Sequence, residues 1–196
     1  MKDRIRSIFE ESVRTKQDFL KNHAALLAET IRTLVTVLDS GKKIVLFGNG
    51  GSAADAQHIA AEFVNRFMID RRPLPAIALT TDSSVLTAIA NDFGYEEIFA
   101  KQIEALGARG DAALGITTSG TSPNVLKGLE AAQRIGMIGI GLSGPAESPM
   151  KRYCRHYLYV GEAATARIQE VHELVGHTIV EIVDELLFGS EQRPQA

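Results

Sequence analysis

Two side chains in the stretch Ile44–Asn65 could do chemistry together. His58 and Glu62 stand four residues apart in a segment that favours a helix. Residues at this spacing share one helix face, one turn apart. An imidazole and a carboxylate so placed can hold a divalent metal ion, act as an acid–base pair, or simply face solvent. The spacing alone leaves all three interpretations open.

The residues just before this helix favour an anion. Ile44–Phe47 predicts a buried strand, Gly48–Gly51 a tight turn, and a helix opens at Ser52. Glycines let a ligand approach the backbone, and the free N–H groups of a first helical turn favour phosphate. The order Gly-Asn-Gly-Gly-Ser lacks the glycine spacing of dinucleotide folds and the lysine of a P-loop. We therefore expect a small phosphorylated ligand, contacted by Asn49, Gly50, Gly51 and Ser52.

A second candidate phosphate site follows another apolar run. The segment TTSGTS lies between an expected strand, Ala112–Ile116, and an expected helix, Pro123–Ile135. Hydroxyls and backbone N–H groups at such a junction make a phosphate cradle that needs no lysine. The hydroxyls belong to Thr117, Thr118, Ser119 and Ser122.

Short apolar runs alternate with helical segments along the chain, which predicts a parallel sheet covered by helices on both faces. The ligand site of such a sheet lies at the carboxyl ends of its strands. An expected turn at Asn91–Gly94 brings Asn91 and Asp92 to the same edge. The remaining expected elements are a strand at Ala76–Thr80, helices at Ser83–Ala90 and Glu96–Leu106, strands at Met137–Leu142 and Tyr157–Val160, and a helix at Thr165–Phe188.

The last helix carries further candidate ligands. Gln169 and His177 are eight residues apart, about 80° around a helix, so both can lean toward one centre. His172 is three residues from Gln169 and five from His177. Periodicity does not choose between His172 and His177.

The first forty residues contain neither glycine nor proline and carry apolar residues at helical spacing. One long helix, or two in series, has more apolar surface than a small sheet can cover, so subunit packing is expected. We expect a single domain over 1–196, with oligomerisation helices at 1–40, an α/β core at 41–188 and a loose tail at 189–196.

Composition excludes several classes of protein. The chain has 196 residues, a formal net charge of −3 and one cysteine, Cys154. This charge disfavours nucleic-acid and membrane-surface partners, and one cysteine forms no internal disulfide. With no apolar run long enough to span a membrane, a cytoplasmic location is expected.

Four separated motifs resemble the sugar-isomerase (SIS) domain family, and within it the phosphoheptose isomerases. They are FGNGGSAADAQHIAAEF, ANDFGYEEIF, GITTSGTSPNV and ARIQEVHELVGH. The resemblance implies a doubly wound, flavodoxin-like α/β fold of three layers. One departure is conservative, since Thr117 replaces a serine that often opens the third motif and keeps its hydroxyl.

The resemblance also implies an activity. Members interconvert sedoheptulose 7-phosphate and D-glycero-D-manno-heptose 7-phosphate for surface glycans, including lipopolysaccharide, through a metal-assisted enediolate. They are homotetramers with active sites between subunits, and each subunit holds one Zn²⁺. Carried over residue by residue, the metal ligands are His58, Glu62, Gln169 and His177, and Glu62 and His177 are the acid–base pair. The substrate contacts are Asn49, Gly50, Gly51, Ser52, Glu62, Asn91, Asp92, Thr117, Thr118, Ser119, Ser122 and Gln169.

A non-catalytic relative is the alternative. Ala53-Ala54 after Ser52 resembles the branch of the family associated with the replication initiator DnaA. A protein of that kind would bind a sugar phosphate or the initiator without reaction. Glu62 and His177 weigh against it, because an adaptor needs no acid–base pair.

Overall fold

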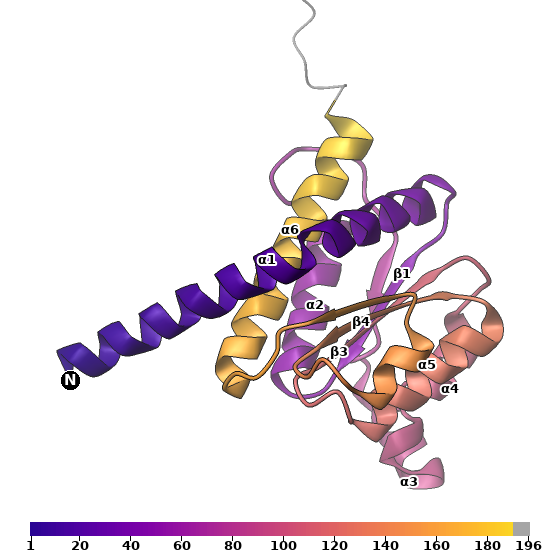
Figure 1. Cartoon of the computed structure of the whole chain (residues 1–196). Helices are drawn as coiled ribbons and strands as arrows, with labels where there is room; N and C mark the ends of the chain where they lie inside the picture. Colours follow the sequence, from indigo (N-terminus) through magenta and orange to yellow (C-terminus); the bar gives the residue numbers. More distant parts are fainter. Residues whose placement is uncertain (190–196) are drawn as a thin grey trace, which may run out of the picture.

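In the computed structural model, which describes residues 1–189, five parallel strands form one sheet in the order β2-β1-β3-β4-β5 (Figure 1). The strands are β1 (Ile44–Gly48), β2 (Ala76–Ala78), β3 (Ala112–Thr117), β4 (Ile138–Ser143) and β5 (His156–Tyr159). The α-helices are α1 (Lys2–Asp39), α2 (Gly51–Val64), α3 (Ser83–Phe93), α4 (Ala100–Leu106), α5 (Pro123–Ile135) and α6 (Thr165–Phe188). Residues 1–189 also contain two 3₁₀ turns, η1 (Tyr95–Glu97) and η2 (Pro149–Tyr153). The expected three-layer, doubly wound α/β fold is confirmed.

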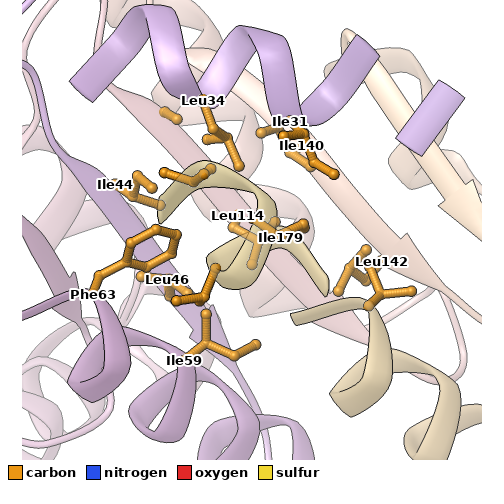
Figure 2. Close-up of a cluster of buried hydrophobic side chains, with 14 of the residues drawn as sticks. Ile31, Leu34, Ile44, Leu46, Ile59, Phe63, Leu114, Ile140, Leu142 and Ile179 are labelled. Atoms are coloured by element: carbon orange, nitrogen blue, oxygen red, sulfur yellow. The ribbon is translucent and has the colours of Figure 1, made fainter. Parts of the chain in front are cut away.

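The two faces of the sheet bury separate sets of side chains, because neighbouring residues of a strand point to opposite faces. In β1, Ile44 and Leu46 pack with α1, α2 and α6, whereas Val45 and Phe47 pack with α4 and α5. Figure 2 shows the first set, where Ile59 and Phe63 of α2 lie against the sheet. This packing fixes α2 and α6 on the same face.

The N-terminal segment is one helix, α1, and not two in series. Its second half buries one face, with buried residues from Phe19 to Leu38, while its first half extends away from the sheet (Figure 1). Ile5, Phe9 and Val13 there are exposed apolar residues. The division into oligomerisation helix and core stays a prediction, and residues 190–196 of the expected tail lie outside the described residues. Within residues 1–189, no helix is long and apolar enough to cross a membrane.

Two local predictions around α3 and α4 are wrong. Asn91–Gly94 is not a turn, because α3 continues to Phe93 and ends only at Gly94, whose φ of 98° a residue with a side chain rarely adopts. The segment Glu96–Leu106 is not one helix, since η1 and α4 are separated by Ile98 and Phe99, which both turn into the core.

The other boundaries follow the sequence closely. The expected bounds of α5 and α6 are confirmed, and Asp82 caps α3 by accepting a hydrogen bond from the Val85 amide at 3.0 Å. The ends of β1, β3, β4 and β5 differ from the prediction by one residue, and α2 begins at Gly51 instead of Ser52. β2 is two residues shorter than expected, because Leu79 and Thr80 lie in a turn.

Candidate functional site

The carboxyl ends of β1 and β3 lie side by side, with Gly48 opposite Ile116. A Cβ at Gly48 would lie 2.8 Å from the Ile116 carbonyl oxygen and 2.8 Å from the Ser52 Cβ, so only glycine allows this approach. The chain then turns through Gly50, at a φ of 56°, into α2. The first turn of α2 and the loop after β3 therefore meet at one edge of the sheet, as expected for this topology.

The loop after β3 gathers its hydroxyls around Thr117. The Thr117 Oγ1 lies 3.2 Å from the Ser119 Oγ and 2.9 Å from the Ser122 Oγ. The Thr121 backbone N–H donates to the Ser119 Oγ at 3.3 Å, and Thr118 lies half-buried in the same loop. α5 begins directly afterwards at Pro123. Hydroxyls beside the positive end of a helix dipole can bind an anion.

Asn49 is held by two residues that lie within the quoted motifs but were not among the expected substrate contacts. Its Oδ1 accepts hydrogen bonds from the Asn124 Nδ2 at 2.8 Å and the Tyr95 hydroxyl at 3.1 Å, and its Nδ2 donates to the Asn124 Oδ1 at 2.8 Å. Asn124 is buried. A pocket of about 480 Å³ opens here, lined by Asn49, Tyr95, Glu96, Ser122, Pro123, Asn124 and Lys127.

His58, Glu62 and His177 converge between α2 and α6. The Nε2 atoms of His58 and His177 are 2.9 Å apart, and the Glu62 Oε1 lies 3.2 Å from His58 Nε2 and 3.8 Å from His177 Nε2. The second carboxylate oxygen of Glu62 is buried and without a hydrogen-bond partner within residues 1–189. Together these three side chains form a group that could hold a metal ion.

His172 is not in this cluster. It is buried, and its Nε2 lies 3.2 Å from the Ser143 carbonyl oxygen. The choice that periodicity left open between the two histidines thus falls on His177.

Gln169 lies at the other end of the α2–α6 contact. Its side-chain amide packs against Gly51, where a Cβ would come within 2.2 Å of the Gln169 Nε2. It also interacts with Asp55, a buried carboxyl one helical turn after Gly51. Gly51 and His58 are about 10 Å apart along α2. Gln169 therefore lies closer to the Gly-Asn turn than to the histidines, and its place among metal ligands stays a prediction.

Asp55 was not among the site residues expected from the sequence, although it shares a helix face with Gly51, His58 and Glu62. Burial raises the pKa of Asp55 to about 6, against the lowering effects of Gln169 and His58. Its position, four residues after Gly51 and three before His58, could have predicted that it lies beside the site. Asn124 lies within the motif GITTSGTSPNV, but its contact with Asn49 was not predictable from spacing, because the two residues are 75 positions apart.

Asn91 and Asp92 lie at the exposed end of α3, where the Asn91 Nδ2 donates to the Asp92 Oδ1 at 2.8 Å. In this single chain, no contact found among residues 1–189 joins them to the Ser/Thr loop (117–122) or to the His–Glu cluster (His58, Glu62 and His177). Their role as substrate contacts stays a prediction.

Comparison with known proteins decides the family. The SIS domain family model matches residues 7–144. A phosphoheptose isomerase of Desulfovibrio desulfuricans is 50% identical over 91% of this chain and 85% of its own length. The solved phosphoheptose isomerase GmhA of Neisseria gonorrhoeae is 40% identical with a TM-score of 0.88, over 94% of this chain and 98% of that one. The corresponding structure from Francisella tularensis is 38% identical with a TM-score of 0.89, over 93% and 97%.

This chain belongs to the phosphoheptose isomerases of the SIS domain family. It is therefore an enzyme that isomerises a sugar phosphate. For this SIS domain, the Ser/Thr loop and the His–Glu cluster are the natural candidates for the phosphate end and the reacting end of a substrate.

Proposed function

We propose that this SIS domain interconverts sedoheptulose 7-phosphate and D-glycero-D-manno-heptose 7-phosphate. The observation that carries the proposal is the convergence of Glu62 with His58 and His177, which come from helices more than a hundred residues apart in sequence. A carboxylate beside two imidazoles provides both a base and an acid, and an aldose–ketose isomerisation requires both.

The reaction moves one proton between neighbouring carbons. We assign Glu62 to take the proton from C1 of the ketose and return it at C2, through the carboxylate oxygen that would not hold a metal ion. His177 is assigned to move a proton between the two oxygens, through the ring nitrogen that would not hold the ion. Glu62 is suited to this because only one of its carboxylate oxygens faces the histidines, while the other is buried and without a hydrogen bond within residues 1–189. A carboxylate oxygen without a hydrogen-bond partner is free to accept a proton.

The spacing of the three donor atoms fits Zn²⁺. A tetrahedral ion with bonds of ~2.0–2.1 Å separates its ligand atoms by roughly 3.3 Å, and the three separations here are 2.9, 3.2 and 3.8 Å. His58, Glu62 and His177 would hold the ion, with Gln169 as the fourth expected ligand. Lewis acidity toward O1 and O2 of the sugar is the chemistry that a bound ion supplies.

The other expected contacts orient the substrate. Ser52 and the hydroxyls of Thr117, Thr118, Ser119 and Ser122 would bind the phosphate near the first turns of α2 and α5. Binding energy from this unreactive end then positions the carbons at Glu62. We assign Asn49, Gly50 and Gly51 to further contacts with the substrate.

A homotetramer with sites between subunits accounts for two features of the single chain. The first half of α1 exposes apolar residues, and Asn91 and Asp92 lie apart from the other site residues. A cytoplasmic enzyme of surface-glycan synthesis remains our prediction. No structural observation favours the DnaA-linked alternative.

Turnover of sedoheptulose 7-phosphate before and after chelation tests this function. We expect conversion to the heptose phosphate, loss of activity in the chelated protein and recovery with added Zn²⁺, while circular dichroism stays unchanged. Absence of turnover in the zinc-loaded protein would refute the proposed substrate.

A further inference from the structure

The connection between α2 and β2, residues 65–75, contacts both helices that carry the His–Glu cluster. Arg71 is its anchor, because the side chain of this residue is only 1% exposed. Its guanidinium donates hydrogen bonds to the carbonyl oxygens of Glu62 at 3.0 Å, Phe63 at 2.8 Å and Asn65 at 3.3 Å. The last carbonyls of a helix have no partner within the helix, so Arg71 closes the end of α2 immediately after Glu62.

The same guanidinium reaches α6. The Arg71 Nε donates to the Asp184 Oδ1 at 2.8 Å, and the Asp184 side chain is also 1% exposed. Asp184 follows His177 by seven residues, which places both on one face of α6, two turns apart. Arg71 thus links the end of α2, directly after Glu62, to a point on α6 two turns after His177.

A second residue of the connection touches the cluster itself. The Phe67 ring stacks on the His177 imidazole, with ring centroids 5.4 Å apart and planes 4° from parallel. This contact fixes the plane of an imidazole whose Nε2 lies 2.9 Å from His58. Arg71 constrains the helices, and Phe67 constrains the ring.

We propose that Arg71 and Phe67 are positioning residues that hold Glu62 and His177 in register across the α2–α6 contact; this rests on the function proposed above. Both act through other residues, because Arg71 bonds backbone carbonyls and Asp184, and Phe67 packs on the His177 ring. Their effect is geometric, since a displacement of about 1 Å at a reacting group can lower a rate by roughly 100-fold. Lysine does not replace Arg71, because one ammonium cannot bond several carbonyls and a carboxylate in a fixed planar pattern.

The test compares Arg71→Lys and Phe67→Leu with Asp111→Asn as a matched control. Asp111 is another buried carboxylate in an ion pair, with the partly exposed Lys43 Nζ at 2.5 Å, but the pair lies next to the first residues of β1 and β3 and belongs to neither α2 nor α6. For each protein, kcat and KM for sedoheptulose 7-phosphate, the thermal midpoint and the Co²⁺ dissociation constant are measured. Co²⁺ reports the geometry of the ligands without turnover.

We expect Arg71→Lys and Phe67→Leu to lower kcat by about 10- to 100-fold and weaken Co²⁺ binding by a similar factor, with KM changed by less than about twofold. Asp111→Asn should lower the thermal midpoint and leave kcat and Co²⁺ affinity unchanged. If Arg71→Lys does not fold, Phe67→Leu decides, because it removes no buried charge.

Three results would overturn the proposal: wild-type kcat in the folded variants, equal loss of kcat in Asp111→Asn, or unchanged Co²⁺ affinity. Failure of the proposed function is distinguishable. A wild-type chain that binds Co²⁺ but leaves sedoheptulose 7-phosphate unchanged refutes the substrate, and the Co²⁺ affinities of the variants then decide the positioning role. A wild-type chain that neither binds Co²⁺ nor converts sedoheptulose 7-phosphate refutes both the proposed function and the positioning role.

Discussion

Thr117 is the central hydroxyl of the loop after β3. Its Oγ1 meets the hydroxyls of both Ser119 and Ser122, and the residue is 4% exposed. Thr117→Val keeps the shape of the side chain but removes the hydroxyl. We expect KM for the sugar phosphate to rise roughly tenfold, the effect of one hydrogen bond to a charged group, with a smaller change in kcat. Steady-state kinetics and inhibition by inorganic phosphate measure this; an unchanged KM and inhibition constant would remove the loop from the phosphate site.

At the scale of single residues, local spacing predicted some of the site and missed the rest. His58 and Glu62 share a helix face by their sequence separation, so their proximity followed from the sequence. Asp55 shares this face but becomes notable only through burial against α6, and Asn124 only through Asn49. Burial and long-range partners depend on how elements pack, which one sequence does not state.

At the scale of elements, Gly176 is one of the points where α2 and α6 are in close contact. A Cβ on Gly176 would come within 2.3 Å of the Ile59 Cδ1, and Ile59 is 2% exposed. Gly176→Ala should therefore separate the helices that carry Glu62 and His177. We expect a loss of about 1–3 kcal/mol in the free energy of unfolding, since overpacking outweighs the better helix propensity of alanine. Denaturant unfolding gives this value, and kcat should fall with it.

The matched variant Ile59→Val shortens the opposing side chain. In the double variant it should restore part of both the stability and the kcat that Gly176→Ala loses, because the two sites are in contact. Strictly additive effects would show that the close approach does not set the α2–α6 distance.

Element boundaries were predictable where proline, glycine and apolar periodicity agreed, as in α5 and α6. Element boundaries were not predictable where a tertiary contact determined them. Asn91 and Asp92 are typical turn residues, yet α3 runs through them because only Gly94 forces the chain to change direction. Ile98 and Phe99 separate η1 from α4 because both side chains are buried in the core cluster that includes residues of α4 and α5.

At the scale of the whole molecule, buried neutral histidines set the response to acid. Burial lowers the pKa of His172 from 6.5 to about 4, against the raising effect of its bond to Ser143. Burial also lowers the pKa of His23 and of His156. The unfolded chain therefore binds protons below pH 6.5 that the folded chain does not, so stability is full above this pH and falls toward pH 4.

His172→Gln isolates this effect, because the glutamine amide can still donate to the Ser143 carbonyl. From pH 7 to pH 5, wild type should lose about 2 kcal/mol more unfolding free energy than the variant. The raised pKa of Asp55 has the opposite sign and cancels in the comparison. Denaturant unfolding at both pH values measures the difference; parallel losses in the two proteins would contradict it.

The exposed first half of α1 concerns the assembly. Ile5, Phe9 and Val13 lie along one stripe of the helix and are more than half exposed. A stripe of this kind favours burial between subunits. Phe9→Asp should shift the protein to a smaller species in light scattering, whereas Lys21→Asp, away from the stripe, should not. An unchanged mass for Phe9→Asp would exclude this surface as the principal subunit contact.

The parallel three-layer fold was predictable because alternating apolar strands and helices allow few arrangements. The assembly was only suggested by surplus apolar surface, since a single sequence does not show what covers it.

The most direct test of the account is isomerisation in deuterium oxide. If Glu62 carries the proton between C1 and C2, deuterium enters C2 of the heptose phosphate and C1 of the remaining ketose phosphate over many turnovers, as nuclear magnetic resonance detects. Glu62→Gln should lose this exchange and lower kcat by about 10²- to 10⁴-fold, while Glu185→Gln, an exposed carboxylate of α6, behaves as wild type. Exchange by Glu62→Gln at the wild-type rate would contradict the assignment of Glu62 as the base.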